Sequence, residues 1–308
     1  MKPPDSPDAW RPLPHEFFFG LFLFVTWMRL GFMTGFLGGD ALLYLALIGA
    51  NLWAIWFVRS NGTPRRWRLG LLFYPVAMNI VFMHMKTAVP KIHPARMDAW
   101  LQQIDSLCVG TNLSLRLQPL VHPALTEILS FCYILFFPYL LFSMVYYFCS
   151  ELELLKKFVI GLFTIYGIGF LGYSLVPAAG PYHAIADQFT APLTGGWITG
   201  WNAAVVAAGS NGVDVFPSLH CAISSFFLFF DHQHRPWRFK LYLAPCVGLW
   251  ASTIYLRYHY AIDVVCGFAL SGLALWLAQR FPRAQHTPAA IPTAPAGAAT
   301  PTADSTPQ

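Results

Sequence analysis

Charged residues are scarce in this chain of 308 residues: Asp, Glu, Lys and Arg together make up 11% of it. Soluble domains usually carry about 25%, so an ordinary soluble domain is excluded. The hydrophobic share of 56% also argues against a collagen-like chain, a coiled coil or a mostly disordered chain. The net charge of +5 comes from basic residues scattered between apolar runs, and we therefore expect no nucleic-acid partner.

Cysteine is also sparse, with six residues that form no C-x-x-C pair. Most of them fall inside apolar runs, which predicts small buried hydrophobic side chains. Aromatic residues, in contrast, are abundant, with 27 Phe, 13 Tyr and 11 Trp. Such a content is typical of membrane proteins, whose aromatic rings gather at both interfaces.

Long apolar runs predict the fold class. Seven stretches contain no Asp, Glu, Lys or Arg, and an eighth contains only Arg29. We therefore expect an all-α, polytopic membrane protein with about eight transmembrane helices. The last three runs have 16 residues each, which is about 24 Å of helix against a hydrocarbon core of roughly 30 Å, so their polar flanks should lie inside the membrane. The runs are 17–39, 41–58, 69–85, 128–150, 158–186, 215–230, 241–256 and 264–279.

Basic residues in the predicted loops give the orientation. With eight spans, 13 of the 19 Lys and Arg residues fall on one side of the membrane, four of them in segment 59–68. By the positive-inside rule this side is cytoplasmic, and both termini lie there. We predict an integral protein of the inner or plasma membrane. Six basic residues remain on the other side or within the membrane: Arg29, Lys86, Lys91, Arg96, Arg116 and Arg257.

The apolar runs also divide the chain into four parts. Two long segments, 86–123 and 178–214, lie on the outer side, and Asp98 to Leu107 predicts a short amphipathic helix on the membrane surface. The Ala/Pro/Thr-rich tail is expected to be disordered. The parts are an N-terminal arm (1–15), two N-terminal transmembrane helices (16–60), a six-helix membrane core (61–283) and the tail (284–308).

Two histidines carry the candidate chemistry. His259 and Asp263 are four residues apart, so on a helix they share one face, and the carboxylate can orient the imidazole ring. Ionisable groups inside a membrane are costly and usually functional. His220 lies at the outer start of the sixth span, and the predicted topology places it at the same membrane face as His259.

Pro217-Ser218, just before an apolar run, predicts a helix start, because Ser is a favoured N-cap and Pro marks helix beginnings. A helix N-terminus presents free backbone N–H groups that bind phosphate oxygens readily. His220, in that first turn, could protonate a leaving oxygen. Without such chemistry Ser218 would only cap the helix and His220 would only anchor the interface.

These motifs resemble those of the type 2 phosphatidic acid phosphatase superfamily. Its second motif, P-S-G-H, is matched by Pro217, Ser218 and His220, with Leu219 in place of Gly. Its third motif, S-R-x5-H-x3-D, is matched by Ser252, His259 and Asp263, with Thr253 in place of Arg. The forms FPSLH and YLRYHYAID resemble the branch of the inositol phosphorylceramide synthases. The resemblance implies that the six-helix core is phosphatase-like.

The resemblance also implies roles for these residues. His259 would be the nucleophile that forms a phosphohistidine, Asp263 would hold its ring, and His220 would be the general acid. Ser218 and nearby backbone N–H groups would bind phosphate oxygens of a lipid phosphate or lipid pyrophosphate. No metal and no other cofactor would be needed.

The family's first motif, K-x6-R-P, is absent. In its expected place stands SLVPAAGPYHAI, whose polar candidates for binding phosphate are Tyr182 and His183. Because a phosphoryl transition state needs positive groups around its oxygens, we expect some of the outer basic residues to replace the missing pair. Arg257 is the foremost candidate. The others are Arg96, Lys91 and Lys86, although Arg96 and Asp98 could equally form a solvated face.

Several alternatives stay open. Water as the second attacking group would make a phosphatase, whereas a lipid or inositol hydroxyl would make a transferase. His220, His259 and Asp263 could instead form a metal site, and His84 with another histidine could bind haem. A non-catalytic transporter is a third possibility, but neither inverted repeats nor paired broken helices are evident. The head group, the acceptor and the oligomeric state are not readable from the sequence.

Overall fold

The computed structural model describes residues 11–280, and these form helices with no strand. The predicted tail at 284–308 and most of the predicted arm at 1–15 lie outside the described residues. The helices that correspond to the predicted spans are α1 (Pro14–Thr34), α2 (Gly39–Arg59), α3 (Pro64–Leu71), α4 (Phe73–Ile92), α7 (Pro123–Ile134), α8 (Phe136–Phe148), α9 (Leu152–Leu175), α12 (Leu219–His234), α13 (Pro236–Tyr255) and α14 (Ala261–Arg280). The shorter elements are α5 (Asp98–Val109), α6 (Leu113–Arg116), η2 (Gln118–Leu120), α10 (Pro181–Ala184), η3 (Ala186–Gln188) and α11 (Trp197–Gly209).

The helices confirm an all-α polytopic membrane protein. Six helical stretches among the described residues are long and apolar enough to cross a membrane: α1, α2, α3 with α4, α7 with α8, α9, and α14. The remaining two predicted spans are helical as α12 and α13 but are not among those six. The count of eight spans therefore stays a prediction.

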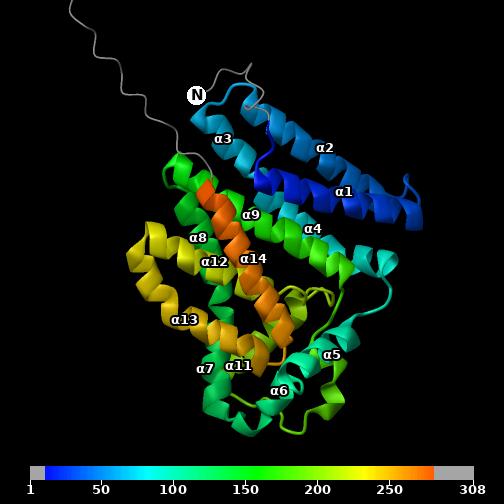
Figure 1. Cartoon of the computed structure of the whole chain (residues 1–308), viewed down its shortest axis with the longest axis vertical. Coiled ribbons are helices and arrows are strands. Elements are labelled where there is room, and N and C mark those ends of the chain that lie inside the picture. Colours follow the sequence, from blue (N-terminus) through cyan, green and yellow to red (C-terminus); the bar gives the residue numbers. More distant parts are fainter. Residues whose placement is uncertain (1–10, 281–308) are drawn as a thin grey trace, which may run out of the picture.

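Helix α9 is the centre of the bundle, and 78% of an apolar 18-residue stretch of this helix is buried. It packs against α1, α12 and α14 (Figure 1). A Cβ on Gly167 would lie 2.7 Å from backbone atoms of Phe18 and Phe19. Only glycine permits this approach of α1, which ties the N-terminal helix pair to the core.

Arg29, the charged residue in the first apolar run, fastens α1 to two helix ends. Its guanidinium donates hydrogen bonds to the carbonyl of Ser174 near the end of α9, at 2.9 Å, and to the carbonyl of Ile92 at the end of α4, at 3.2 Å. The last carbonyls of a helix lack partners within the helix, and a cation is favourable there. The cost of placing this charge in the membrane is thus offset by helix capping.

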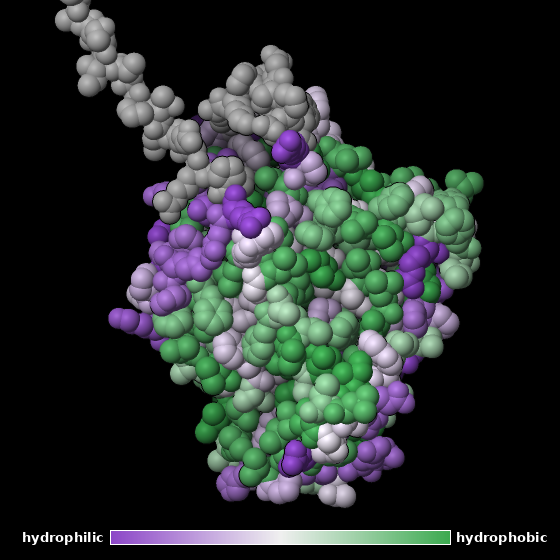
Figure 2. Space-filling model, viewed as in Figure 1, coloured by the Kyte–Doolittle hydropathy of each residue, from purple (hydrophilic) through white to green (hydrophobic). Residues whose placement is uncertain are grey.

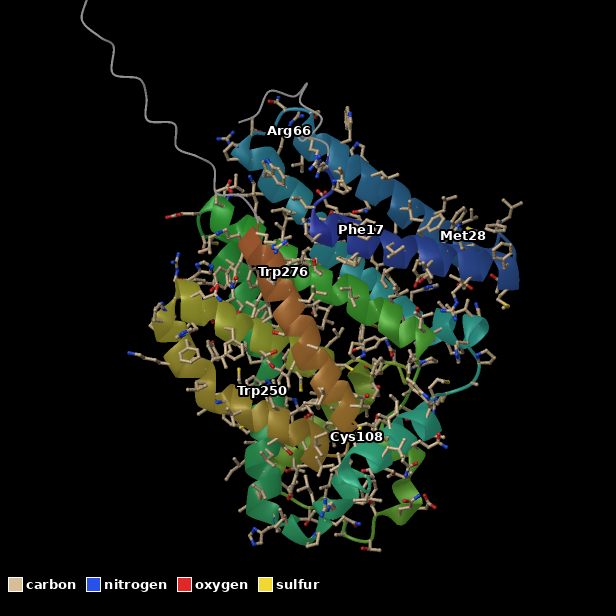
Figure 3. The ribbon with its side chains drawn as sticks, in the orientation of Figure 1. Phe17, Met28, Arg66, Cys108, Trp250 and Trp276 are labelled. Atoms are coloured by element: carbon tan, nitrogen blue, oxygen red, sulfur yellow. The ribbon has the colours of Figure 1, made fainter. Side chains whose placement is uncertain are left out.

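The surface is apolar around the middle of the molecule and polar toward its ends, as the face in Figure 2 shows. Exposed Leu, Phe, Val and Trp side chains occur on α1, α2, α4, α8, α13 and α14. Figure 3 places Arg66, in the Arg-rich segment before α4, and Cys108, on α5, toward opposite ends of the molecule. This arrangement fits a protein that spans a bilayer.

Arg238, near the start of α13, is fully buried with Asp231. Its Nε donates to Asp231 Oδ1 at 2.9 Å, and its Nη2 donates to Ser143 Oγ at 2.6 Å. Tyr139 and Tyr147 donate their hydroxyls to the same carboxylate. The pair fixes the turn between α12 and α13, at the opposite end of these helices from His220 and His259.

The two long segments predicted to lie on the outer side form α5, α6, α10 and α11, and α5, α6 and α11 lie at one end of the molecule (Figure 1). Helix α5 confirms the short helix predicted from Asp98 to Leu107 and extends it to Val109. The second segment contains α11, a helix that the sequence analysis did not predict. Glu127 of α7 holds its start, because the carboxylate accepts hydrogen bonds from the backbone N–H groups of Gly196, Ile198 and Thr199.

Candidate active site

Ser218 begins α12 as the sequence predicts. Its Oγ accepts a hydrogen bond from the backbone N–H of Cys221 at 3.3 Å, which satisfies one free donor of the first turn. Its own N–H donates to the carbonyl of Asp263 at 3.0 Å. The start of α12 is therefore fastened to the first turn of α14, which brings the two motifs together.

His259 lies in the short turn between α13 and α14. The carbonyl of Thr253 accepts hydrogen bonds from the N–H groups of Tyr258 and His259, both at 3.0 Å. Arg257 has a φ of 69°, the left-handed conformation that few residues other than glycine adopt. A strained residue of this kind occurs most often at functional sites, where the surroundings hold it in place.

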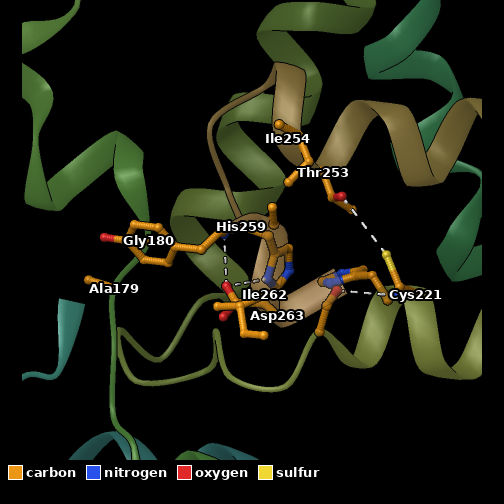
Figure 4. Close-up of polar contacts among 12 residues, drawn as sticks. Ala179, Gly180, Cys221, Thr253, Ile254, His259, Ile262 and Asp263 are labelled. Atoms are coloured by element: carbon orange, nitrogen blue, oxygen red, sulfur yellow. Dashed lines mark hydrogen bonds and ion pairs between the residues drawn. The ribbon is translucent and has the colours of Figure 1, made fainter. Parts of the chain in front are cut away.

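His259 and Asp263 form a buried pair. Their Nδ1 and Oδ2 atoms are 3.5 Å apart, which is an ion-pair distance longer than an ordinary hydrogen bond (Figure 4). Asp263 Oδ2 also accepts a hydrogen bond from the N–H of Tyr260 at 2.8 Å. The carboxylate thus faces Nδ1 of the ring, and Nε2 is the nitrogen left for reaction.

His220 points from the first turn of α12 toward His259, with ring centroids 5.8 Å apart. Its Nε2 contacts the Tyr133 hydroxyl at 3.1 Å. Tyr133, on α7, is 87 residues from His220 in the sequence and belongs to no recognised motif, so it was not predicted as a site residue. The two histidines, Asp263 and Ser218 are gathered at one point of the fold.

A cavity of about 660 Å³ reaches Leu256, Arg257 and Tyr258, the residues just before His259, but His259, His220, Asp263 and Ser218 do not line it. Lys86, Arg96 and Arg257 line it together with Tyr182 and His183. The cavity therefore brings together five of the residues considered as phosphate ligands. Its other wall is apolar and is built by Ala203, Val206 and Ala207 of α11, with Phe189, Leu193, Leu256 and Tyr258.

Arg257 is buried at the inner side of this cavity. Its Nη2 donates to the carbonyl of Ala191 at 2.5 Å, and its guanidinium lies 3.9 Å above the ring of Phe189. Burial lowers the pKa of the guanidinium, although an arginine keeps its charge in proteins. Arg257 is a fixed positive group two residues from His259.

The other candidates differ in their surroundings. Tyr182 donates its N–H to the Arg257 carbonyl at 2.9 Å and is partly buried, and burial raises the pKa of its hydroxyl. His183 and Arg96 are exposed at the cavity. Lys91 does not line the cavity, because its Nζ pairs with Asp40 at 2.5 Å. The solvated-face interpretation is wrong for Asp98, which is buried and accepts hydrogen bonds from Ala179 and Gly180.

The alternative metal site finds no support in the arrangement of side chains. Within residues 11–280, no three His, Cys, Asp or Glu residues are grouped so that they could hold a metal ion. His220 contacts a tyrosine, and His84 pairs with Asp40 at 2.9 Å.

Comparisons with known proteins agree with the motifs. A family profile described as PAP2 superfamily matches residues 100–277, more than half of the chain. Over 152 residues the chain is 29% identical to a protein named phosphoinositol dihydroceramide synthase from Bacteroides thetaiotaomicron. The match covers 45% of this chain and 50% of that protein, so the chain spans about half the length of this curated relative. No solved structure matches the chain significantly. These findings confirm the resemblance seen in the motifs: the chain belongs to the PAP2 superfamily.

Proposed function

We propose that this protein is a lipid phosphoryl-transfer enzyme whose reaction passes through a phosphohistidine at the extracytoplasmic face. The observation that carries the proposal is the cluster of His259, Asp263 and His220, together with a cavity that holds three cations and reaches the residues just before His259. Family membership supports the reaction class. The predicted topology supports the extracytoplasmic location, because the Arg-rich segment near Arg66 lies toward the end of the molecule opposite Cys108 of α5 (Figure 3).

In the first half-reaction, His259 Nε2 attacks the phosphorus of the lipid phosphate. The bond between phosphorus and the lipid oxygen breaks, and His220 gives a proton to that oxygen. Asp263 faces Nδ1, so it orients the ring and stabilises the positive charge that develops on it. Arg257, with the backbone N–H groups at the start of α12 and Ser218, would bind the phosphoryl oxygens, whose charge grows in the transition state.

In the second half-reaction, a hydroxyl oxygen attacks the phosphohistidine, its proton passes to His220, and the bond between phosphorus and nitrogen breaks. We propose that this hydroxyl belongs to a lipid alcohol, so that the enzyme is a phospho-head-group transferase and not a phosphatase. The name of the Bacteroides relative, phosphoinositol dihydroceramide synthase, favours this choice, since it denotes synthesis of a phospholipid and not release of phosphate. The cavity beside Arg257 is large enough for a head group of that size.

The test is acceptor dependence with purified protein in detergent. Phosphatidylinositol, phosphatidic acid and a prenyl diphosphate are each supplied with and without ceramide or diacylglycerol. Free phosphate, inositol phosphate and new phospholipid are then measured by mass spectrometry. We expect a new phospholipid that forms only with the acceptor. Free phosphate, or inositol phosphate from phosphatidylinositol, released without an acceptor would show hydrolysis instead.

His259→Ala provides the second test, because it removes the attacking nitrogen and leaves the helices in place. We expect loss of both half-reactions with an unchanged melting temperature. With a radioactive phosphate in the substrate, the wild-type protein should carry an acid-labile label that His259→Ala lacks. Undiminished turnover by His259→Ala would refute the phosphohistidine mechanism.

A further inference from the structure

Helix α5 has two buried carboxylates on one face. Asp98 and Asp105 are seven residues apart, which is two helical turns, so both point the same way. Leu101 lies between them and is also buried, packed with Ala178 and Tyr260. A surface helix of this kind normally keeps its carboxylates in water. These two need a reason to be buried.

Asp105 holds the start of α14. Its two oxygens accept hydrogen bonds from the backbone N–H groups of Ala261, at 2.8 Å, and Ile262, at 2.9 Å. These N–H groups have no partner within the helix, and a negative charge is favourable at a helix N-terminus. Burial raises the pKa of Asp105, whereas the two N–H donors lower it. Asp263, the partner of His259, follows immediately in the same turn.

Asp98 accepts hydrogen bonds from two separate segments of the chain near the site. One oxygen accepts hydrogen bonds from the Tyr260 hydroxyl, at 3.0 Å, and from the N–H of Gly180, at 2.9 Å. The N–H of Ala179 donates to the carboxylate as well, at 3.1 Å. Tyr260 directly follows His259 in the sequence. The carboxylate therefore joins the segment that carries His259 to the segment that leads to Tyr182 and His183.

We propose that Asp98 and Asp105 are positioning residues for the phosphoryl transfer, and that α5 sets the geometry of the His259–Asp263 pair from outside the site. The inference rests on the proposed function for its catalytic readout. Neither carboxylate lines the cavity. All the hydrogen bonds that they accept from other segments come from residues within three positions of His259 or at 179–180.

The test compares Asp98→Asn and Asp105→Asn with a matched control, Glu127→Gln. An amide keeps the size of the side chain but has one accepting oxygen and no charge. Glu127 has the same kind of role at α11, where it accepts backbone N–H groups, but it has no hydrogen bond to residues 257–263. All three variants are made in the full chain and purified in detergent.

With phosphatidylinositol and ceramide as the probe, we expect kcat to fall on the order of 10²-fold in both Asn variants, because a displacement of about 1 Å costs this much. KM should stay within about threefold, since the residues that touch the substrate are intact. Asp105→Glu should restore part of kcat, because it returns the charge. Glu127→Gln should lose less than about threefold.

Hydrogen exchange gives a readout that needs no turnover. We expect faster exchange of the amides of residues 258–263 in Asp105→Asn, and unchanged exchange there in Glu127→Gln. Wild-type exchange and kcat in both Asn variants would overturn the inference, and so would equal losses of kcat in Glu127→Gln. The proposed function fails separately, through turnover that survives in His259→Ala.

Discussion

Replacing Gly180 by alanine probes how closely the segment before Tyr182 must approach the segment that carries His259. Gly180 has φ 87° and ψ 164°, a region that glycine alone commonly occupies. A Cβ at this position would lie 2.4 Å from the carbonyl oxygen of Tyr258. Real Cβ atoms essentially never come closer than 3.0 Å, so one of the two segments must move by at least 0.6 Å, which is 3.0 minus 2.4.

The expected magnitudes follow from these two observations. The backbone conformation alone should cost about 1–3 kcal/mol of stability in Gly180→Ala. The clash adds a displacement of Tyr258, the residue before His259. Because misplacement by about 1 Å costs on the order of 10²-fold in rate, we expect kcat to fall by about one to two orders of magnitude.

The assay is turnover of phosphatidylinositol with ceramide, measured beside thermal unfolding in the same detergent. Gly200→Ala is the control, because a Cβ there meets no atom within 4 Å in helix α11. That variant should be as stable as the wild type or more stable by up to about 1 kcal/mol, since alanine favours a helix. A Gly180→Ala protein with wild-type melting temperature and kcat would refute the reasoning.

Three further changes test other parts of the structure. Asp231→Asn leaves the buried Arg238 without its counter-charge and should lower the stability of the fold by about 3–5 kcal/mol. The melting temperature should fall, whereas the protein that stays folded should keep its kcat. An unchanged melting temperature would contradict this. Arg257→Gln removes the cation proposed to bind the phosphoryl oxygens and should lower kcat about 10²- to 10³-fold, measured by steady-state kinetics; a rise in KM alone would argue for ground-state binding. Arg29→Ala removes two hydrogen bonds to helix ends and should cost about 2–3 kcal/mol, which denaturant unfolding would measure; equal stability would show that water replaces the guanidinium.

The fold class was predictable because the length and composition of an apolar run indicate a membrane helix at that place in the chain. A membrane helix satisfies its backbone hydrogen bonds internally, so its length and composition appear in the sequence. The breaks inside these runs were less visible. Helix α7 ends at Ile134 and α8 begins at Phe136 within one apolar run, and α9 ends at Leu175 although the charge-free run continues. Composition does not mark such breaks.

The pair of His259 and Asp263 was predicted from a spacing of four residues, which would place both side chains on one helical face. In the structure the two side chains do pair, but His259 lies in the turn before α14, which begins at Ala261, so the turn and not a helical face brings them together. The helix start at Ser218 likewise follows from local chemistry. The companion of His220, by contrast, is Tyr133 from another helix. Nothing in the residues around Tyr133 marks it, because its role depends on how α7 packs against α12.

The sequence by itself determined the membrane class, the long apolar helices, the family motifs and the candidate residues for the chemistry. The tertiary structure alone decided which residues surround them. It placed Arg257 at the cavity and paired Lys91 with Asp40, although both were candidate cations. It also buried Asp98 and Asp105 against the segment of His259. The physical reason is that helical periodicity fixes neighbours three or four residues apart, whereas contacts between distant segments depend on how whole helices pack.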